Sequence, residues 1–226
     1  MNILAIDTAT TACAVGIATD RGATIVRVLD TDRHHTESLA PGILALLEEC
    51  GLTPRDLHRV VVDRGPGLYT GLRVGVTTAT SLAQALGCAL VSVTSLELLA
   101  WGAHDDGVRA TVLCAVDGRR GEVFAQTFQL GEGVEAVGEP EVARPRDVVI
   151  AWATNGAPVT FTGDGVERYL ADFVAVPNGA VFAQSVPSLH AALTIAATRE
   201  PVAAISPLYL RDADAVANFS TRERRS

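Results

Sequence analysis

The sequence predicts an α/β protein, and it leaves open whether the second half is a second copy of the first. The first half alternates apolar strand patterns with amphipathic helix patterns in the order βββαβαβα. The second half opens, as the first does, with an apolar strand, an aspartate, a polar turn and another strand. With 48% hydrophobic residues, the 226-residue chain can bury a sizeable core as one domain or as two lobes. Because the repeated stretch is short, the residues alone favour neither a duplicated lobe nor an unrelated second half.

Three short strands open the chain. Polar turns separate them, which is typical of neighbouring antiparallel strands. The strands are expected at residues 3–7, 12–19 and 23–29.

A helix is expected next, over residues 38–50. Ser38 can cap it, which would leave Pro41 in the first turn, where no backbone donor is needed. Gly51 is placed to end the helix. The apolar positions that recur with a helical period are Leu39, Ile43, Leu46 and Cys50.

The remainder of the first half alternates strands and helices. Strands are expected at 60–62 and 89–93. They are followed by helices at 71–86 and 95–103, and Ser95 is expected to cap the second of these.

The second half has fewer clear elements. We expect a strand pair within 112–128, a strand and turn at 159–165, and helices at 166–173 and 187–200. The polar stretch 104–110 is the natural boundary between lobes.

These elements predict a division of the chain into lobes. The first lobe would cover residues 1–104 and would be completed by 206–226. The second lobe would cover 105–205.

Composition narrows the possible functions. The net charge of −8 lacks the basic surface that binds nucleic-acid phosphates, so another subunit would hold any nucleic acid. All 18 basic residues are arginine, which excludes P-loop and Schiff-base lysine chemistry. The four scattered cysteines, the absence of a leader pattern and the absence of a long apolar run together predict a cytoplasmic protein without membrane association.

Two aspartates open the repeated hairpins. Asp7 and Asp117 stand where two-lobed nucleotide-binding proteins hold phosphate and metal. However, aspartate also ends strands and supports Asx turns, and the first turn lacks the glycine that phosphate approach favours. A weak nucleotide site between the lobes therefore stays an alternative, with five candidate residues: Asp7, Thr10, Asp117, Arg119 and Glu122.

The sequence gives little support for a metal site or for nucleophilic catalysis. His34 and His35 are adjacent and would point in different directions, and the chain has no H-x-x-x-H spacing. A G-x-S-x-G elbow is also missing. We expect no metal site and no catalytic residues.

The stretch DRGPGLYTGLRVG, at 63–75, joins a strand to a helix through glycines. It is no P-loop, since lysine is absent, and its spacing differs from the dinucleotide fingerprint. Gly75 in mid-helix costs on the order of 1 kcal/mol relative to alanine, so it needs a packing reason. Gly71 and Gly75, extended by Thr78 and Leu82, favour close contact with another helix, either in this chain or in a partner.

Five segments together resemble the TsaB (YeaZ) family. The central string at 63–75 is the most specific of them, although Asp63 stands where the family often has glycine. The segments are ILAIDTAT, HHTESLAP, DRGPGLYTGLRVG, AVDGRRGEVF and SPLYLRD.

The resemblance implies an actin/hexokinase/Hsp70-like fold of two RNase H-like lobes with mixed sheets and a degenerate nucleotide site. It implies a non-catalytic partner of a TsaD-type subunit that transfers threonylcarbamoyl to N6 of adenosine 37 in tRNA, together with a TsaE-like ATPase. The chain alone would form a homodimer through a similar surface. No cofactor would be bound tightly, with ATP or ADP possible at the partner interface.

In the family, two first-lobe helices meet the TsaD-type subunit, and these match segments 36–50 and 70–86 here. The resemblance therefore assigns partner binding to one set of residues: Leu39, Ile43, Leu46, Thr70, Gly71, Arg73, Val74, Gly75, Thr78 and Leu82.

Three alternatives remain. An ATPase or small-molecule kinase could use the cleft between Asp7 and Asp117. A homodimeric interaction module would have no tRNA role. A glycoprotease-like peptidase has the least support, because the chain lacks the metal ligands for that chemistry.

Overall fold

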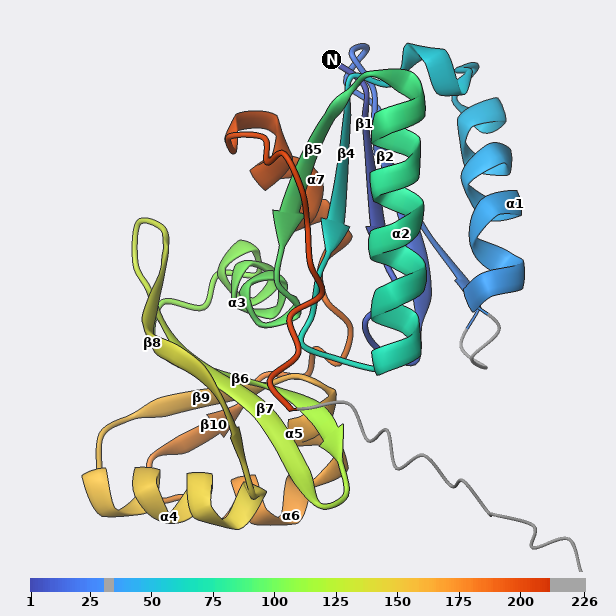
Figure 1. Cartoon of the computed structure of the whole chain (residues 1–226). Helices are drawn as coiled ribbons and strands as arrows, with labels where there is room; N and C mark the ends of the chain where they lie inside the picture. Colours follow the sequence, from blue (N-terminus) through green and yellow to red (C-terminus); the bar gives the residue numbers. More distant parts are fainter. Residues whose placement is uncertain (31–34, 212–226) are drawn as a thin grey trace, which may run out of the picture.

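The computed structural model describes residues 1–30 and 35–211 and contains two five-stranded mixed sheets (Figure 1). The first sheet has the order β3-β2-β1-β4-β5, and the second has the order β10-β9-β6-β7-β8. In each sheet the first three strands of the repeat are antiparallel and the last two run parallel to the first. The two halves therefore share one topology, which confirms the duplicated lobe and the RNase H-like strand order.

The first-lobe elements agree with the predicted order. Its strands are β1 (Ile3–Asp7), β2 (Cys13–Ala18), β3 (Thr24–Asp30), β4 (Arg59–Asp63) and β5 (Ala89–Val93). Its helices are α1 (His35–Glu49), the short 3-10 turn η1 (Pro54–Asp56), α2 (Tyr69–Leu86) and α3 (Ser95–Asp105).

The second lobe repeats this order. Its strands are β6 (Thr111–Arg119), β7 (Glu122–Leu130), β8 (Val134–Ala143), β9 (Val159–Thr162) and β10 (Gly179–Val181). Its helices are α4 (Pro145–Asn155), α5 (Asp164–Arg168), α6 (Leu170–Phe173) and α7 (Leu189–Thr198). The expected helix at 166–173 is thus two short helices, and the sequence patterns missed β8, α4 and β10.

The boundary between the lobes differs from the prediction at one helix. Residues 187–200 were placed in the second lobe, yet α7 packs on the first sheet, with Leu189 and Leu193 against Ile3 and Val61 (Figure 1). The helix in the same place of the first repeat, α3, covers the second sheet instead. Each repeat therefore contributes its last helix to the other sheet, and α3 and α7 contact each other between the sheets.

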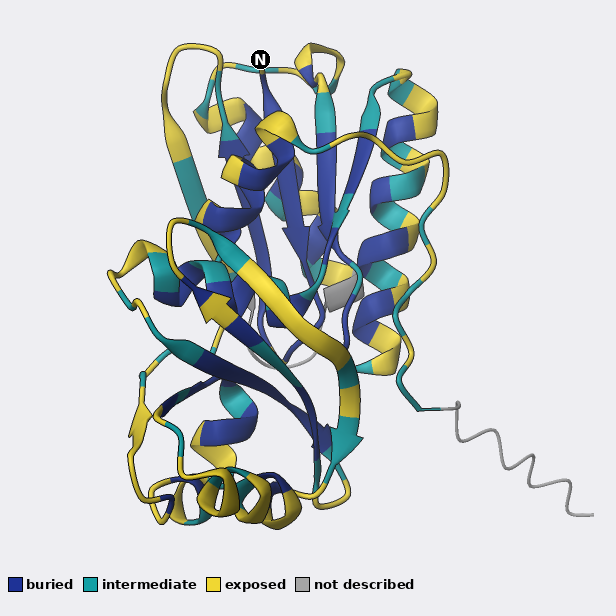
Figure 2. Cartoon of the chain, turned by 90° about the vertical axis from the view of Figure 1, so that its left-hand side faces the viewer, coloured by how far each residue is buried: buried dark blue, intermediate teal, exposed yellow. Residues whose placement is uncertain are grey.

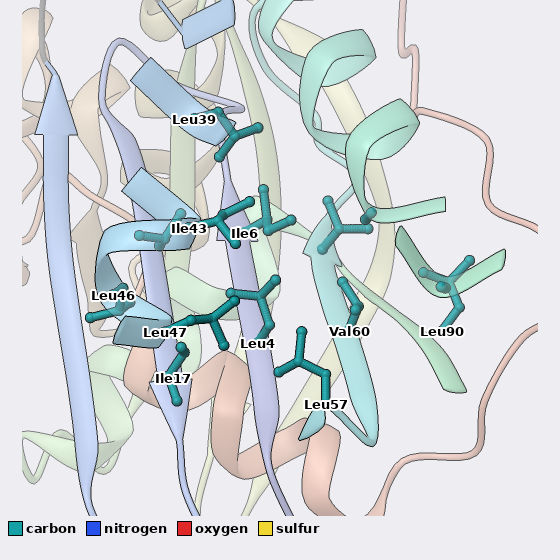
Figure 3. Packing of buried hydrophobic residues seen from close by; sticks show 14 of the residues in the cluster. Leu4, Ile6, Ile17, Leu39, Ile43, Leu46, Leu47, Leu57, Val60 and Leu90 are labelled. Atoms are coloured by element: carbon teal, nitrogen blue, oxygen red, sulfur yellow. The ribbon is translucent and has the colours of Figure 1, made fainter. Parts of the chain in front are cut away.

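The core of the first lobe lies between its sheet and the two helices α1 and α2. Leucine and isoleucine side chains of α1 point at Leu4 and Ile6 of β1 (Figure 3). Buried residues line both sheets, whereas most of α4 is exposed (Figure 2). Burying one such aliphatic side chain contributes about 1.5–3 kcal/mol, so this packing fixes α1 and α2 against the sheet.

The start of α1 and the cap of α3 differ from expectation, while one helix end is confirmed. The first helix begins at His35, so Pro41 lies inside it and Ser38 is not its first residue. The N-cap of α3 is Thr94, whose hydroxyl accepts a hydrogen bond from the backbone N–H of Glu97. Gly51 does follow α1, with a left-handed φ of 65°.

Residues 201–211, which we name the C-terminal strap, run along the first lobe to the second (Figure 1). The backbone N–H of Val202 bonds the carbonyl of Leu90 in β5, and that of Leu208 bonds the carbonyl of Arg64. Leu210 then packs on the second-lobe core. Of the segment 206–226 that is expected to complete the first lobe, Leu208 and Tyr209 contact the first lobe, and residues 212–226 lie outside the described part.

Candidate functional site

The β1–β2 turn carries Asp7 and Thr10, and its polar groups bond within the chain. The Ala9 N–H donates to Asp7 Oδ1 at 2.8 Å, and the Ala12 N–H donates to the Thr10 hydroxyl at 3.3 Å. The carbonyl of Ala9 accepts from the Leu68 N–H at 2.6 Å. The Ala9 and Ala12 N–H groups therefore donate to side chains of their own turn, which disfavours their use in a phosphate site.

Gly71 and Gly75 explain why the turn can lie so close to α2. A Cβ at Gly71 would lie 2.0 Å from the Thr8 carbonyl oxygen, and one at Gly75 would lie 2.4 Å from Thr8 Oγ1. Both glycines are buried. The expectation that they face another helix is therefore wrong, because their small face receives the turn of their own lobe.

The second hairpin neutralises its aspartate with arginine. Asp117 is 6% exposed, accepts the Arg119 N–H at 2.9 Å and pairs with the Arg119 guanidinium at 3.0 Å. Arg168 approaches the same carboxylate at 3.6 Å. A nucleotide site would need the Asp117 carboxylate to be free to bind a metal ion. Instead, the guanidinium groups of Arg119 and Arg168 lie beside it.

Glu122, the last candidate of the weak nucleotide site, is also engaged. It pairs with Arg211 at the end of the strap, and that guanidinium lies 5.8 Å from the ring centroid of Phe124. Within residues 1–30 and 35–211, no group of three or more histidines, cysteines or acidic residues could hold a metal ion.

A pair of buried carboxyl groups was missed by the sequence analysis. Asp63 ends β4, next to Asp7 at the end of the parallel strand β1, and the two are 1% and 0% exposed. The sequence contains a pattern that could have revealed the pair. Two apolar strands each end in an aspartate, and parallel pairing of these strands brings both aspartates to one edge of the sheet. Burial raises the pKa of Asp7 to about 7, and burial raises the pKa of Asp63 well above its usual range.

The proposed partner residues on α1 do not reach the surface. Leu39, Ile43 and Leu46 are at most 4% exposed and form part of the first-lobe core (Figure 3). Their assignment to partner contact is wrong, because the apolar period that marks them faces the sheet. The outward residues of α1 include Ala40 and Leu44, and Leu44 is 57% exposed.

The outward face of α2 keeps the other assigned residues. Thr70 and Arg73 are exposed, while Val74, Thr78 and Leu82 are half-buried. Two adjoining hollows lie between α1 and α2, with volumes of about 350 and 240 Å³, and both are lined by Ala40 and Thr78. We name them the α1–α2 groove; its further outward-facing lining residues are Arg73, Val74, Thr77, Leu44 and Leu82.

An aromatic contact holds the strap beside this groove. Tyr209 stacks on Tyr69 with 4.9 Å between ring centroids, and its hydroxyl accepts a hydrogen bond from Arg73 Nε at 3.0 Å. The Arg73 guanidinium also lies 4.1 Å from the centroid of Tyr69. The strap therefore links the start of α2 to Glu122 of the second lobe.

Comparisons with known proteins agree on one family. The family model described as "TsaD: tRNA N6-adenosine threonylcarbamoyltransferase" matches residues 29–186. The chain is 34% identical over 165 residues to the tRNA threonylcarbamoyladenosine biosynthesis protein TsaB of Escherichia coli, which covers 69% of this chain and 71% of that protein.

Two further relatives support this result. TsaB of Bacillus subtilis is 39% identical over 137 residues, 59% of this chain and 58% of that protein, so the match spans less than two thirds of that relative. A crystal structure of a Pseudomonas aeruginosa protein, described as similar to peptidase YeaZ, superposes with a TM-score of 0.81 and 29% identity. That superposition covers 93% of this chain and 99% of the other.

Proposed function

Because the chain belongs to the TsaB (YeaZ) family of tRNA threonylcarbamoyladenosine biosynthesis proteins, we propose that it is a non-catalytic subunit of a tRNA threonylcarbamoyl transferase. In this role it binds a TsaD-type catalytic subunit in the cytoplasm. The complex transfers the threonylcarbamoyl group to N6 of adenosine 37.

The observation that carries the non-catalytic role is the closure of both interlobe turns. In the first turn the Ala9 and Ala12 N–H groups donate to side chains of the turn itself, and the turn meets α2 at Gly71 and Gly75. In the second turn, Arg119 and Arg168 neutralise Asp117. The Ala9 and Ala12 N–H groups and the Asp117 carboxylate are thus engaged within the chain, which disfavours phosphoryl transfer at these turns.

The surface that best fits a protein partner is the α1–α2 groove. It combines the exposed apolar side chain of Leu44 with the half-buried Val74 and Leu82, and Arg73 stands at one end. An apolar centre with a polar rim is typical of protein interfaces. The same groove serves a homodimer when the catalytic subunit is absent.

Other components act through the complex. The net charge of −8 favours tRNA contact through the catalytic subunit rather than through this chain. A TsaE-like ATPase joins the assembly, and ATP or ADP binds weakly at the partner interface. Among the described residues no helix is long and apolar enough to cross a membrane.

Deletion of the gene tests the proposed function. We expect threonylcarbamoyladenosine to disappear from the tRNA pool, as measured by mass spectrometry of digested tRNA, and to return when the gene is supplied in trans. Retention of the modified nucleoside in the deletion strain would contradict the proposal.

An ATPase or small-molecule kinase remains the rival. The two-lobed architecture with Asp7 and Asp117 at equivalent hairpins favours it. The occupied donors and the arginine-paired Asp117 oppose it.

A further inference from the structure

Asp7 and Asp63 form a side-chain pair that the proposed function does not use. They end the neighbouring parallel strands β1 and β4, whose register places Ile6 beside Val62 one residue earlier. Both carboxyl groups are buried, and the register of the two strands places them side by side at one edge of the sheet. The pair therefore lies directly beneath the β1–β2 turn and the loop at Gly65.

Three of the four carboxyl oxygens have donors from the protein. Asp7 Oδ1 accepts the Ala9 N–H, and Asp63 Oδ1 accepts the Gly65 N–H, each at 2.8 Å. Asp63 Oδ2 accepts the Ser95 hydroxyl at 2.7 Å. The fourth oxygen, Asp7 Oδ2, is buried and meets no N–H or O–H donor in the described structure.

A proton shared with Asp63 would satisfy that fourth oxygen. A carboxylate accepts hydrogen bonds and cannot donate one, whereas a protonated Asp63 donates to Asp7. Two adjacent buried carboxylates cannot both remain charged without a large electrostatic cost. Burial and then the charge of Asp7 raise the pKa of Asp63, which agrees with this assignment.

The charges around the pair add to this cost. Asp164, at the start of α5 in the second lobe, acts on Asp7 as a further negative charge. Asp164 Oδ1 is fixed by the Asp117 N–H at 2.9 Å, and Asp117 is in turn neutralised by Arg119 and Arg168. The two arginines therefore compensate Asp117, and the charges that act directly on Asp7 are those of carboxyl groups.

We propose that Asp7 and Asp63 share one proton, which locks the β1–β2 turn to the loop at Gly65 and opens this contact when it is lost. Loss of the proton leaves two buried negative charges that face Asp164 across the lobes. The repulsion is relieved when the ends of β1 and β4 separate and water reaches the carboxylates, which opens the turn that carries Ala9 and the loop that carries Gly65. The lock is thus a pH-sensitive contact between the β1–β2 turn and the loop at Gly65, and it does not depend on the proposed function.

Amide hydrogen exchange of the whole chain tests the lock between pH 5.5 and 8.5. After correction for the intrinsic rate, we expect protection at Ala9 and Gly65 to fall by up to about tenfold per pH unit once the shared proton is released. Asp63→Asn supplies a permanent donor to Asp7 and should keep protection constant over the same range. Asp20→Asn, at an exposed position, is the matched control and should behave as the unsubstituted chain does.

A second measurement needs no variant. Carboxyl carbon signals of ¹³C-aspartate-labelled protein should show a proton retained by this pair above pH 6, and that step should vanish in Asp63→Asn and persist in Asp164→Asn. Protection that is independent of pH, or carboxyl signals that all titrate below pH 5, would overturn the proposal. So would restoration of protection at pH 8 by Mg²⁺, since the oxygens would then hold a cation instead of a proton.

Discussion

The hydroxyl of Thr8 donates a 2.7 Å hydrogen bond to the carbonyl oxygen of Gly71, which joins the β1–β2 turn to the first turn of α2. The β1–β2 turn of the same lobe therefore fills the space beside Gly71 and Gly75. The groove on the opposite side of α2, toward α1, is what remains available to a partner.

Gly75→Ala should destabilise the chain by about 1–3 kcal/mol, because the added methyl group would lie 2.4 Å from Thr8 Oγ1. An exposed mid-helix glycine would show the opposite sign, since alanine is favoured there by about 1 kcal/mol. Urea unfolding measures the difference, with Thr77→Ala on the exposed face of α2 as the control. A stabilised Gly75→Ala variant would show that the turn does not need this close approach.

Tyr209→Ala should detach the strap from α2. It removes the stack on Tyr69 and the hydrogen bond from Arg73, at a cost of about 0.5–1.5 kcal/mol for this partly exposed contact. Tyr209→Phe keeps the ring and loses only the hydrogen bond, so it should cost less. Limited proteolysis near residue 205 and urea unfolding report the two effects; equal behaviour of both variants would contradict a stacking contribution.

The stability of the chain should depend on pH through Asp164. Burial raises its pKa to about 6, so between the ordinary aspartate pKa of about 4 and this value the folded state retains a proton that the unfolded state has lost. The free energy of unfolding therefore falls as pH rises through that window, by an amount on the order of 2–3 kcal/mol, and this contribution is constant above it.

Asp164→Asn checks this dependence, because its amide oxygen can still accept the Asp117 N–H. Urea titrations at pH 4 and pH 6.5 should show a smaller difference for the variant than for the unsubstituted chain. An unchanged difference would assign the pH dependence to other groups.

Mg-ATP should not be turned over by the isolated chain. Asp117 is paired with Arg119 and Arg168, and the Ala9 and Ala12 N–H groups of the first turn bond within the chain, which disfavours a site for the metal and the terminal phosphate. Isothermal titration and a phosphate-release assay measure binding and turnover. Turnover that is lost in Asp117→Asn would favour the kinase or ATPase alternative.

Local patterns were sufficient to predict the order of most elements. The period of Leu39, Ile43 and Leu46 and the position of Gly51 identify α1, whereas the short strand–aspartate–turn repeat left the duplication open until the sheet topology was known. Strand β8 is mostly exposed and lacks the apolar alternation of a half-buried strand. The sequence of α7 does not show which of the two sheets the helix covers, because this depends on tertiary packing.

The functional face was harder to predict for a physical reason. A helix period shows which residues are buried, and it does not separate burial in the core from burial under a partner. Leu39 and Gly75 were therefore assigned to the partner although the sheet and the β1–β2 turn cover them. Leu44 lies outside the period and was overlooked, although it is the more exposed residue.

The affinity of the purified chain for its TsaD-type subunit tests the central claim most directly. Leu44→Asp places a charge in the α1–α2 groove, while Ile150→Asp makes a similar change on α4, where Ile150 is 52% exposed. Titration calorimetry should show Leu44→Asp binding at least about tenfold more weakly, a loss of about 1.4 kcal/mol, and Ile150→Asp binding as the unsubstituted chain does. Equal affinity of the Leu44→Asp variant and the unsubstituted chain would contradict docking through this groove.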